Sequence, residues 1–84
     1  MAKKRLPNHA HDSVLWLRLC FIIRVECGFA NDPISFPKIR KFCGDVSLKD
    51  LDMTLQEMVK HGRLSCSREW TEDGRMIEMF TNNE

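Results

Sequence analysis

The sequence predicts a mainly α-helical fold with a small antiparallel β-hairpin at its C-terminal end. An amphipathic segment over residues 47–61 begins with a capping serine and stops at Gly62. A shorter helical segment precedes it across one tight turn. Two runs of strand-forming residues follow it, separated by Asp73-Gly74, a dipeptide typical of hairpin turns. The chain has 84 residues, enough for one domain.

The composition is that of a soluble globular protein, with 43% hydrophobic and 30% charged residues. The net charge of +1 is not the strongly basic balance that indicates a nucleic-acid binder by itself. The apolar run over residues 14–25 contains Arg18 and Arg24 and is too short to cross a bilayer. No secretory signal is evident, so we expect a cytoplasmic protein without a membrane partner.

The cysteines do not form a metal-binding pattern. None belongs to a C-x-x-C pair, and no Cys/His spacing matches a zinc site. We expect reduced residues of the core or of an interface, and no metal or cofactor. The sequence also has no glycine-rich phosphate loop and no nucleophile–base pair, which argues against an enzyme. The four cysteines are Cys20, Cys27, Cys43 and Cys66.

The first 11 residues are predicted to be a flexible basic arm. Lys3, Lys4 and Arg5 cluster there, and Pro7 disfavours a helix at the residue before it. Such an arm is either a solvated tail or a segment that follows a phosphate backbone. Residues 12–81 are predicted to form the single domain, and residues 82–84 a frayed C-terminus.

The first helix is predicted to begin after Asp12 or Ser13 and to end near Cys27, with Gly28 in a left-handed conformation. Between residues 14 and 27, only two arginines and one glutamate are polar, and they do not share one face. A helix that is apolar nearly all round must be covered on more than one side. One expectation is a homodimer, in which Trp16, Phe21 or Ile23, or a subset of them, packs on a second copy of the chain. The alternative is a helix that is central to the monomer.

The second helix is predicted to begin at the N-cap Ser35, after a possible strand residue at Ile34, and to end at Gly44. Ile39 and Phe42 are predicted to face inward. Three basic side chains are predicted to face mostly outward: Lys38, Arg40 and Lys41.

The third helix repeats the same start signal, with Ser47 as the N-cap and Asp50 at its third position. Its predicted inward face consists of apolar residues, namely Leu48, Leu51, Leu55, Met58 and Val59. Its predicted outward face consists of Lys49, Asp52, Met53, Gln56 and Lys60. The tight, glycine-containing turn between the second and third helices is typical of a helix-turn-helix.

The hairpin is predicted to pair residues 63–70 with residues 75–81. A two-residue loop at the turn would place Glu69 opposite Glu78, and like charges at this position repel. A three-residue loop over residues 72–74 places Arg68 opposite Glu78 and gives Gly74 the left-handed conformation. We therefore predict the three-residue loop.

This order of elements resembles the winged helix-turn-helix superfamily of DNA-binding domains. The resemblance covers Ile34–Phe80, and its best-matching segments are Leu55…Gly62-Arg63-Leu64 and Asp73-Gly74-Arg75. It implies that the third helix enters the major groove and that the hairpin is the wing. The residues implied to face the groove are Lys49, Asp52, Met53, Gln56 and Lys60. Those implied to lie on the wing are Arg68 and Arg75, and those near the DNA backbone are Lys38, Arg40 and Lys41.

Two functions follow from this resemblance. The first is a dimeric, DNA-binding transcriptional regulator similar in size to small phage and bacterial regulators, with two third helices in successive major grooves about 34 Å apart. The second is a winged-helix module that binds a protein, as an accessory subunit or as a phage-type inhibitor of a host enzyme. The third helix has two lysines against Asp50, Asp52 and Glu57, which favours the second function.

Overall fold

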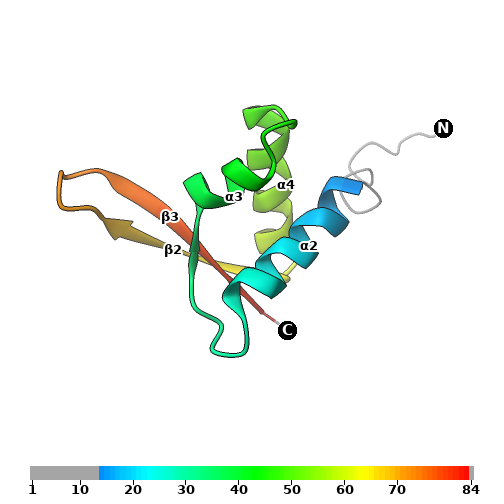
Figure 1. Cartoon of the computed structure of the whole chain (residues 1–84), viewed down its shortest axis with the longest axis horizontal. Coiled ribbons are helices and arrows are strands. Elements are labelled where there is room, and N and C mark those ends of the chain that lie inside the picture. The colour runs from blue at the N-terminus through cyan, green and yellow to red at the C-terminus, as the bar shows by residue number, and fades with distance from the viewer. Residues whose placement is uncertain (1–13, 84) are drawn as a thin grey trace.

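The computed structural model describes residues 14–83, which form three helices and one three-stranded antiparallel sheet (Figure 1). About half of these residues are helical, so the fold is mixed α/β rather than mainly α. Within this range, no helix has the length and hydrophobicity needed to cross a membrane. The elements in chain order are α2 (Val14–Cys27), β1 (Ile34–Ser35), α3 (Phe36–Phe42), α4 (Leu48–Lys60), β2 (Leu64–Trp70) and β3 (Met76–Asn82).

Local signals in the sequence set the helix ends, as predicted. The Ser35 hydroxyl accepts the backbone N–H of Lys38 at the start of α3, and the Ser47 hydroxyl accepts that of Asp50 at the start of α4. After α2 and α4, Gly28 and Gly62 adopt positive φ angles of 66° and 78°. A side chain disfavours this conformation, so glycine ends both helices at low cost.

The sheet has the order β1-β3-β2, and its hairpin has the predicted register. Arg68 lies opposite Glu78, and Trp70 lies opposite Met76. Gly74 closes the three-residue loop with a φ of 86°. The short strand β1 pairs with the other edge of β3, where Ile34 lies opposite Phe80. β3 is therefore the central strand.

The core lies between one face of the sheet and the three helices. Phe80 is fully buried at the centre of this face, and Ile34 and Leu64 are buried on the strands beside it. The helices contribute the rest of the core, which contains Leu19, Ile39, Cys43, Leu51, Leu55 and Met58 with no exposed surface. One face of α2 is thus part of the core of the monomer.

Two residues that were expected to contact a second copy belong to this core. Trp16 is 8% exposed and Ile23 is 0% exposed, so neither presents a surface to another chain. The prediction is wrong for both, because the face of α2 that carries them packs on α4 and on the sheet. Of the three predicted residues, Phe21 alone is exposed, at 69%.

The predicted facing of three other apolar side chains also needs correction. Phe42 and Leu48 were expected to point inward but are 45% and 48% exposed. On α3, Ile39 and the C-cap residue Cys43 occupy the buried face instead. Cys66 is exposed on the hairpin and is therefore not a core residue. All four cysteines have free thiols, and burial raises the pKa of the Cys27 and Cys43 thiols.

The end of the described chain is held by hydrogen bonds, contrary to the frayed segment predicted over residues 82–84. Asn82 belongs to β3, and its backbone N–H and C=O bond the side-chain amide of Asn31 at 2.9 and 2.8 Å. The Asn83 side chain accepts the Ser65 hydroxyl and donates to the Gly62 carbonyl. The prediction is wrong for both asparagines, and Glu84 lies outside the described residues.

The hairpin extends away from the core. Only Leu64 is buried in β2, and every following residue of that strand is exposed. Figure 1 shows β2 and β3 continuing past the helices to a turn at one end of the molecule, while α2 lies at the other end. β2 beyond Leu64 and most of the turn are therefore exposed to solvent, whereas β3 is half-buried or buried from Ile77 to Asn82.

Candidate nucleic-acid interface

The outer face of α4 carries the five side chains that the sequence placed there. Successive helical residues are 100° apart, so these five lie within about 100° of one another on one face. All five are exposed, whereas Leu51, Leu55 and Met58 are buried on the opposite face. The two lysines stand at the two ends of this face, and the acidic, thioether and amide side chains lie between them. In chain order, the five are Lys49, Asp52, Met53, Gln56 and Lys60.

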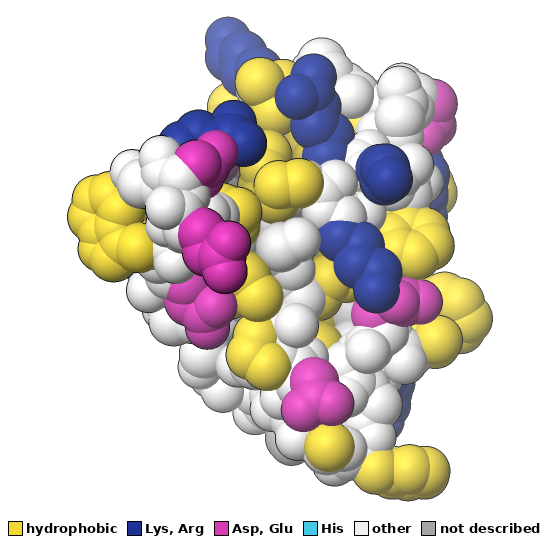
Figure 2. Space-filling model, turned by 60° about the vertical axis from the view of Figure 1, so that its left-hand side comes forward, with side chains coloured by type: hydrophobic (Ala, Val, Ile, Leu, Met, Phe, Trp, Pro, Cys, Tyr) yellow, Lys and Arg dark blue, Asp and Glu magenta, His cyan; other side chains and the backbone are white. Residues whose placement is uncertain are grey.

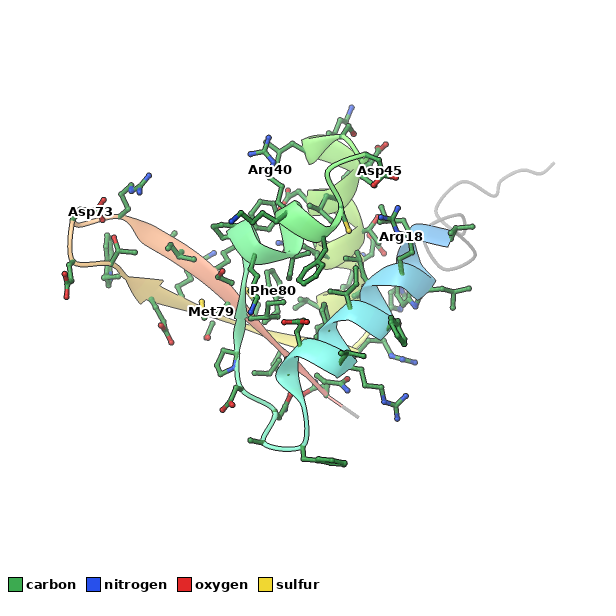
Figure 3. All side chains as sticks on the ribbon, in the orientation of Figure 1. Arg18, Arg40, Asp45, Asp73, Met79 and Phe80 are labelled. Atoms are coloured by element: carbon green, nitrogen blue, oxygen red, sulfur yellow. The ribbon has the colours of Figure 1, made fainter. Side chains whose placement is uncertain are left out.

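An ion pair joins α2 to the turn between α3 and α4, just before this helix. Arg18 donates from Nη1 and Nη2 to the two carboxylate oxygens of Asp45, at 3.1 and 3.0 Å. Nη2 also lies 3.4 Å from the Phe42 carbonyl oxygen at the end of α3. The hydrogen bonds from Arg18 lower the pKa of the Asp45 carboxyl, and the same bonds raise the pKa of Arg18. Figure 3 shows the two side chains turned toward each other.

This pair changes the charge that surrounds the start of α4. Asp45 lies three residues before the start of α4. From the sequence alone, its charge would add to the negative charge of the acidic residues of this helix. In the structure, its charge is matched by a guanidinium in bidentate contact. No sequence signal indicates the pair, because its two residues are 27 positions apart.

The basic side chains of α3, the helix that precedes α4, are exposed. Lys38 forms an ion pair with Glu26 of α2, with a distance of 3.2 Å from Nζ to Oε1. Within residues 14–83, Arg40 and Lys41 have no carboxylate in ion-pair contact. Figure 3 shows Arg40 directed away from the body of the molecule. These two cations are therefore available to a phosphate group.

The hairpin has the opposite charge balance. Arg68 faces Glu78 across the strands, and the Arg75 Nε donates to an Asp73 oxygen at 3.1 Å. Hydrogen bonds from the Thr71 hydroxyl and from Arg75 lower the pKa of the Asp73 carboxyl. Glu69 and Glu72 add two more carboxylates, so acidic groups outnumber basic ones on the hairpin. Figure 2 shows acidic side chains on the projecting hairpin and basic ones over the neighbouring helices.

The hairpin also carries exposed apolar side chains that charge-based reasoning did not identify as functional. Trp70 is 74% exposed, and its cross-strand neighbour Met76 is 49% exposed. A shallow depression beside them is lined by Phe36, Pro37, Met76, Ile77 and Glu78. The strand-forming residues that predicted this hairpin indicated a sheet, but not that Trp70 and Met76 would be exposed.

The remaining predicted residues lie elsewhere. Lys3, Lys4 and Arg5 fall outside the described residues. Between residues 14 and 83, no cluster of three His, Cys, Asp or Glu side chains has the geometry to hold a metal ion. A comparison of the chain with the models of known families, with curated proteins and with solved structures found no match.

Proposed function

We propose that this chain is a winged helix-turn-helix protein that binds double-stranded DNA with α4 in the major groove. In this assignment, α3 and α4 form the helix-turn-helix, and β2 and β3 form the wing. The observation that carries the proposal is the arrangement of the outer face of α4, which has a cation at each end and base-reading groups between them.

The dimensions of α4 suit this role. Lys49 and Lys60 are 11 residues apart, which corresponds to roughly 16 Å along a helix. The major groove is about 12 Å wide, so the two lysines are able to reach phosphates on its two sides. Arg40 and Lys41 on α3 add two cations next to the same helix. These contacts would position the protein without reading the sequence.

The central residues of the face offer chemistry for recognising bases. Gln56 is suited to the N6 and N7 groups of adenine, and Met53 to the methyl group of thymine. Asp52 accepts a hydrogen bond, and the exocyclic amino group of cytosine is the major-groove donor that a carboxylate prefers. A carboxylate at this position would repel DNA unless such a donor faces it. We therefore assign Asp52 to specificity rather than to affinity.

The proposal is tested in two steps. Preferred sites are first selected from a duplex library, and binding to labelled duplexes of these sites is then measured by fluorescence anisotropy. We expect the affinity to fall steeply between about 50 and 200 mM salt, because phosphate contacts release counterions. Replacing Lys49 and Lys60 with alanine would lower the slope of log K against log salt by about 2. An absence of binding at low salt would contradict the proposal.

A second candidate function is a winged-helix module that binds a protein through the hairpin. It is favoured by the exposed Trp70 and Met76 among acidic side chains, since DNA phosphates repel such a surface while protein interfaces are rich in Trp and Met. A stoichiometric partner recovered with the wild-type chain and lost with Trp70→Ser would support this function, provided that DNA binding is absent.

A further inference from the structure

We propose that the outer face of α2 is a two-fold interface between two copies of this chain, paired with their α2 helices antiparallel. This inference goes beyond DNA binding and does not depend on it. The interface is formed by four residues that we call the α2 stripe: Val14, Leu17, Phe21 and Val25.

The α2 stripe is an apolar surface that residues 14–83 leave uncovered. At 100° per residue, its four members lie within about 80° of one another and opposite the buried face of the helix. Their exposed fractions are 72%, 65%, 69% and 55%, whereas the four residues of the buried face are at most 8% exposed. A helix with two apolar faces is stable in water when both are covered.

The charges next to the stripe are bound within the chain. Arg18 lies at one side of the stripe and forms its two hydrogen bonds with Asp45. Arg24 lies at the other side of the stripe and also has an interaction within the chain. The stripe itself contains no charged residue, so a partner with a charged recognition surface gains little from it. A second copy of the same apolar stripe fits better.

The spacing of the stripe is nearly symmetric when the helix is reversed. Its members follow one another at intervals of three, four and four residues. In an antiparallel pair related by a two-fold axis, Val14 faces Val25 of the other copy, and Leu17 faces Phe21. The two valines then match in size, and Leu17 packs on the larger Phe21, which favours close packing between helices.

The available area predicts a weak dimer. Phe21 has the largest side chain of the stripe, and an aromatic side chain buries roughly 150–250 Å² when it is fully covered. With the three aliphatic residues, one copy offers on the order of 400 Å², below the roughly 600–1,000 Å² per partner of a standard interface. We therefore expect a dimer that forms only at high concentration.

The position of α2 leaves the rest of the molecule accessible. Figure 1 shows α2 at the end of the molecule that lies away from the hairpin turn. A dimer joined through α2 would therefore direct its two hairpin tips outward. The interface and the hairpin are thus compatible in one assembly.

The first experiment measures the mass of the full chain by light scattering over micromolar to submillimolar concentrations. We expect a mass that approaches twice the 9.9 kDa of one chain. Phe21→Glu and Leu17→Glu should each raise the dimer dissociation constant at least about tenfold. Circular dichroism would verify that each variant stays folded. The matched control is Trp70→Glu, which changes an equally exposed aromatic residue on the hairpin and should leave the dimer intact.

The second experiment tests the direction of pairing with disulfide trapping. In a chain with Cys20→Ser and Cys66→Ser, a mixture of the L17C and F21C variants should cross-link faster than either variant alone. A parallel pair would instead favour cross-linking of L17C with itself. That result would overturn the antiparallel arrangement.

Three results would overturn the interface as a whole. The first is a monomeric mass at all concentrations. The second is a dimer that resists both glutamate substitutions or that is lost with Trp70→Glu. The third is a monomer that binds neutral phosphatidylcholine vesicles through Phe21, which would assign the stripe to a lipid surface.

Discussion

The Arg18 guanidinium binds both carboxylate oxygens of Asp45, at 3.0 and 3.1 Å, and so joins the middle of α2 to the turn between α3 and α4. This contact links the helix that carries the α2 stripe to the helix that carries the proposed DNA-binding face. An exposed ion pair therefore joins these elements in addition to the apolar core.

Asp45→Asn should lower the free energy of unfolding at neutral pH. The folded-state pKa of the Asp45 carboxyl is lowered, so its contribution is present above the unfolded-state value, near 3.8, and is lost as the pH falls through the folded-state value. We therefore expect the urea midpoints of wild type and variant to differ at pH 7 and to converge below about pH 4. Arg18→Met should show the same pattern.

The control for this prediction is Asp32→Asn. Asp32 is an exposed carboxylate that forms no ion pair with the residues described in the structure. Its replacement should leave the midpoint nearly unchanged at both pH values. Equal effects of the two substitutions would show that general charge, and not the contact with Arg18, is responsible.

Asp52→Lys distinguishes the two candidate functions. On the outer face of α4 it replaces a repulsive charge with an attractive one, so non-specific DNA affinity should rise about tenfold or more at low salt. Specificity for cytosine at the contacted position should be lost. Anisotropy with matched and mismatched duplexes measures both effects. If the hairpin binds a protein instead, the same substitution leaves capture of that partner unchanged while DNA affinity stays negligible.

Asn31→Ala should lower the free energy of unfolding by roughly 1–3 kcal/mol. The side-chain amide of Asn31 bonds both backbone groups of Asn82, and its φ of 54° lies in the left-handed region, which alanine disfavours. Asn31→Gly loses the same two bonds but accepts the backbone conformation. Chemical denaturation of both variants separates the two effects, and equal stabilities would show that the conformation contributes nothing.

Gly74→Ala and Gly44→Ala form a matched pair with opposite expected signs. Gly74 has a φ of 86°, so a Cβ atom there strains the hairpin turn by about 1–2 kcal/mol. Gly44 has no such φ, and the nearest atom to an added Cβ is the Lys41 carbonyl oxygen at 3.9 Å. Alanine at this position should be neutral or should stabilise the chain by up to about 1 kcal/mol. Hydrogen exchange of the hairpin amides measures the first effect, and thermal unfolding measures the second.

Short-range signals made much of the fold predictable. The caps at Ser35 and Ser47 act within three residues, and the register of the hairpin follows from the repulsion of Glu69 and Glu78 in the alternative pairing. The outer face of α4 was also predictable, because most of its polar and apolar residues separate at the helical period, with the buried Thr54 and the exposed Leu48 as exceptions.

The facing of α2 was not predictable, for a physical reason. This helix carries apolar residues on nearly all sides, so its sequence shows no periodic contrast between apolar and polar positions. Nothing in the sequence therefore separates the buried Trp16 and Ile23 from the exposed Leu17 and Phe21. On α3, only two turns are present, and the larger Phe42 is exposed while the smaller Cys43 is buried. Packing decides both cases, and packing depends on residues far away in the chain.

The contact between Arg18 and Asp45 was beyond the reach of sequence reasoning as well. Neither residue has a local signal that identifies its partner, and many other pairs of opposite charge exist in the chain. The same applies to Asn31 and Asn82, which are 51 positions apart. The candidate site was therefore foreseen in its list of side chains but not in the contacts that hold it in place.

Because β2 contributes only Leu64 to the interior, the distal part of the hairpin has little influence on whether the chain folds. Selection for a stable core does not restrict the length or the side chains of that segment. Residue pairs could be inserted or removed near Trp70 and Met76 without disturbing the interior around Phe80. The length of the hairpin can therefore change to suit a binding partner without a change in the globular body.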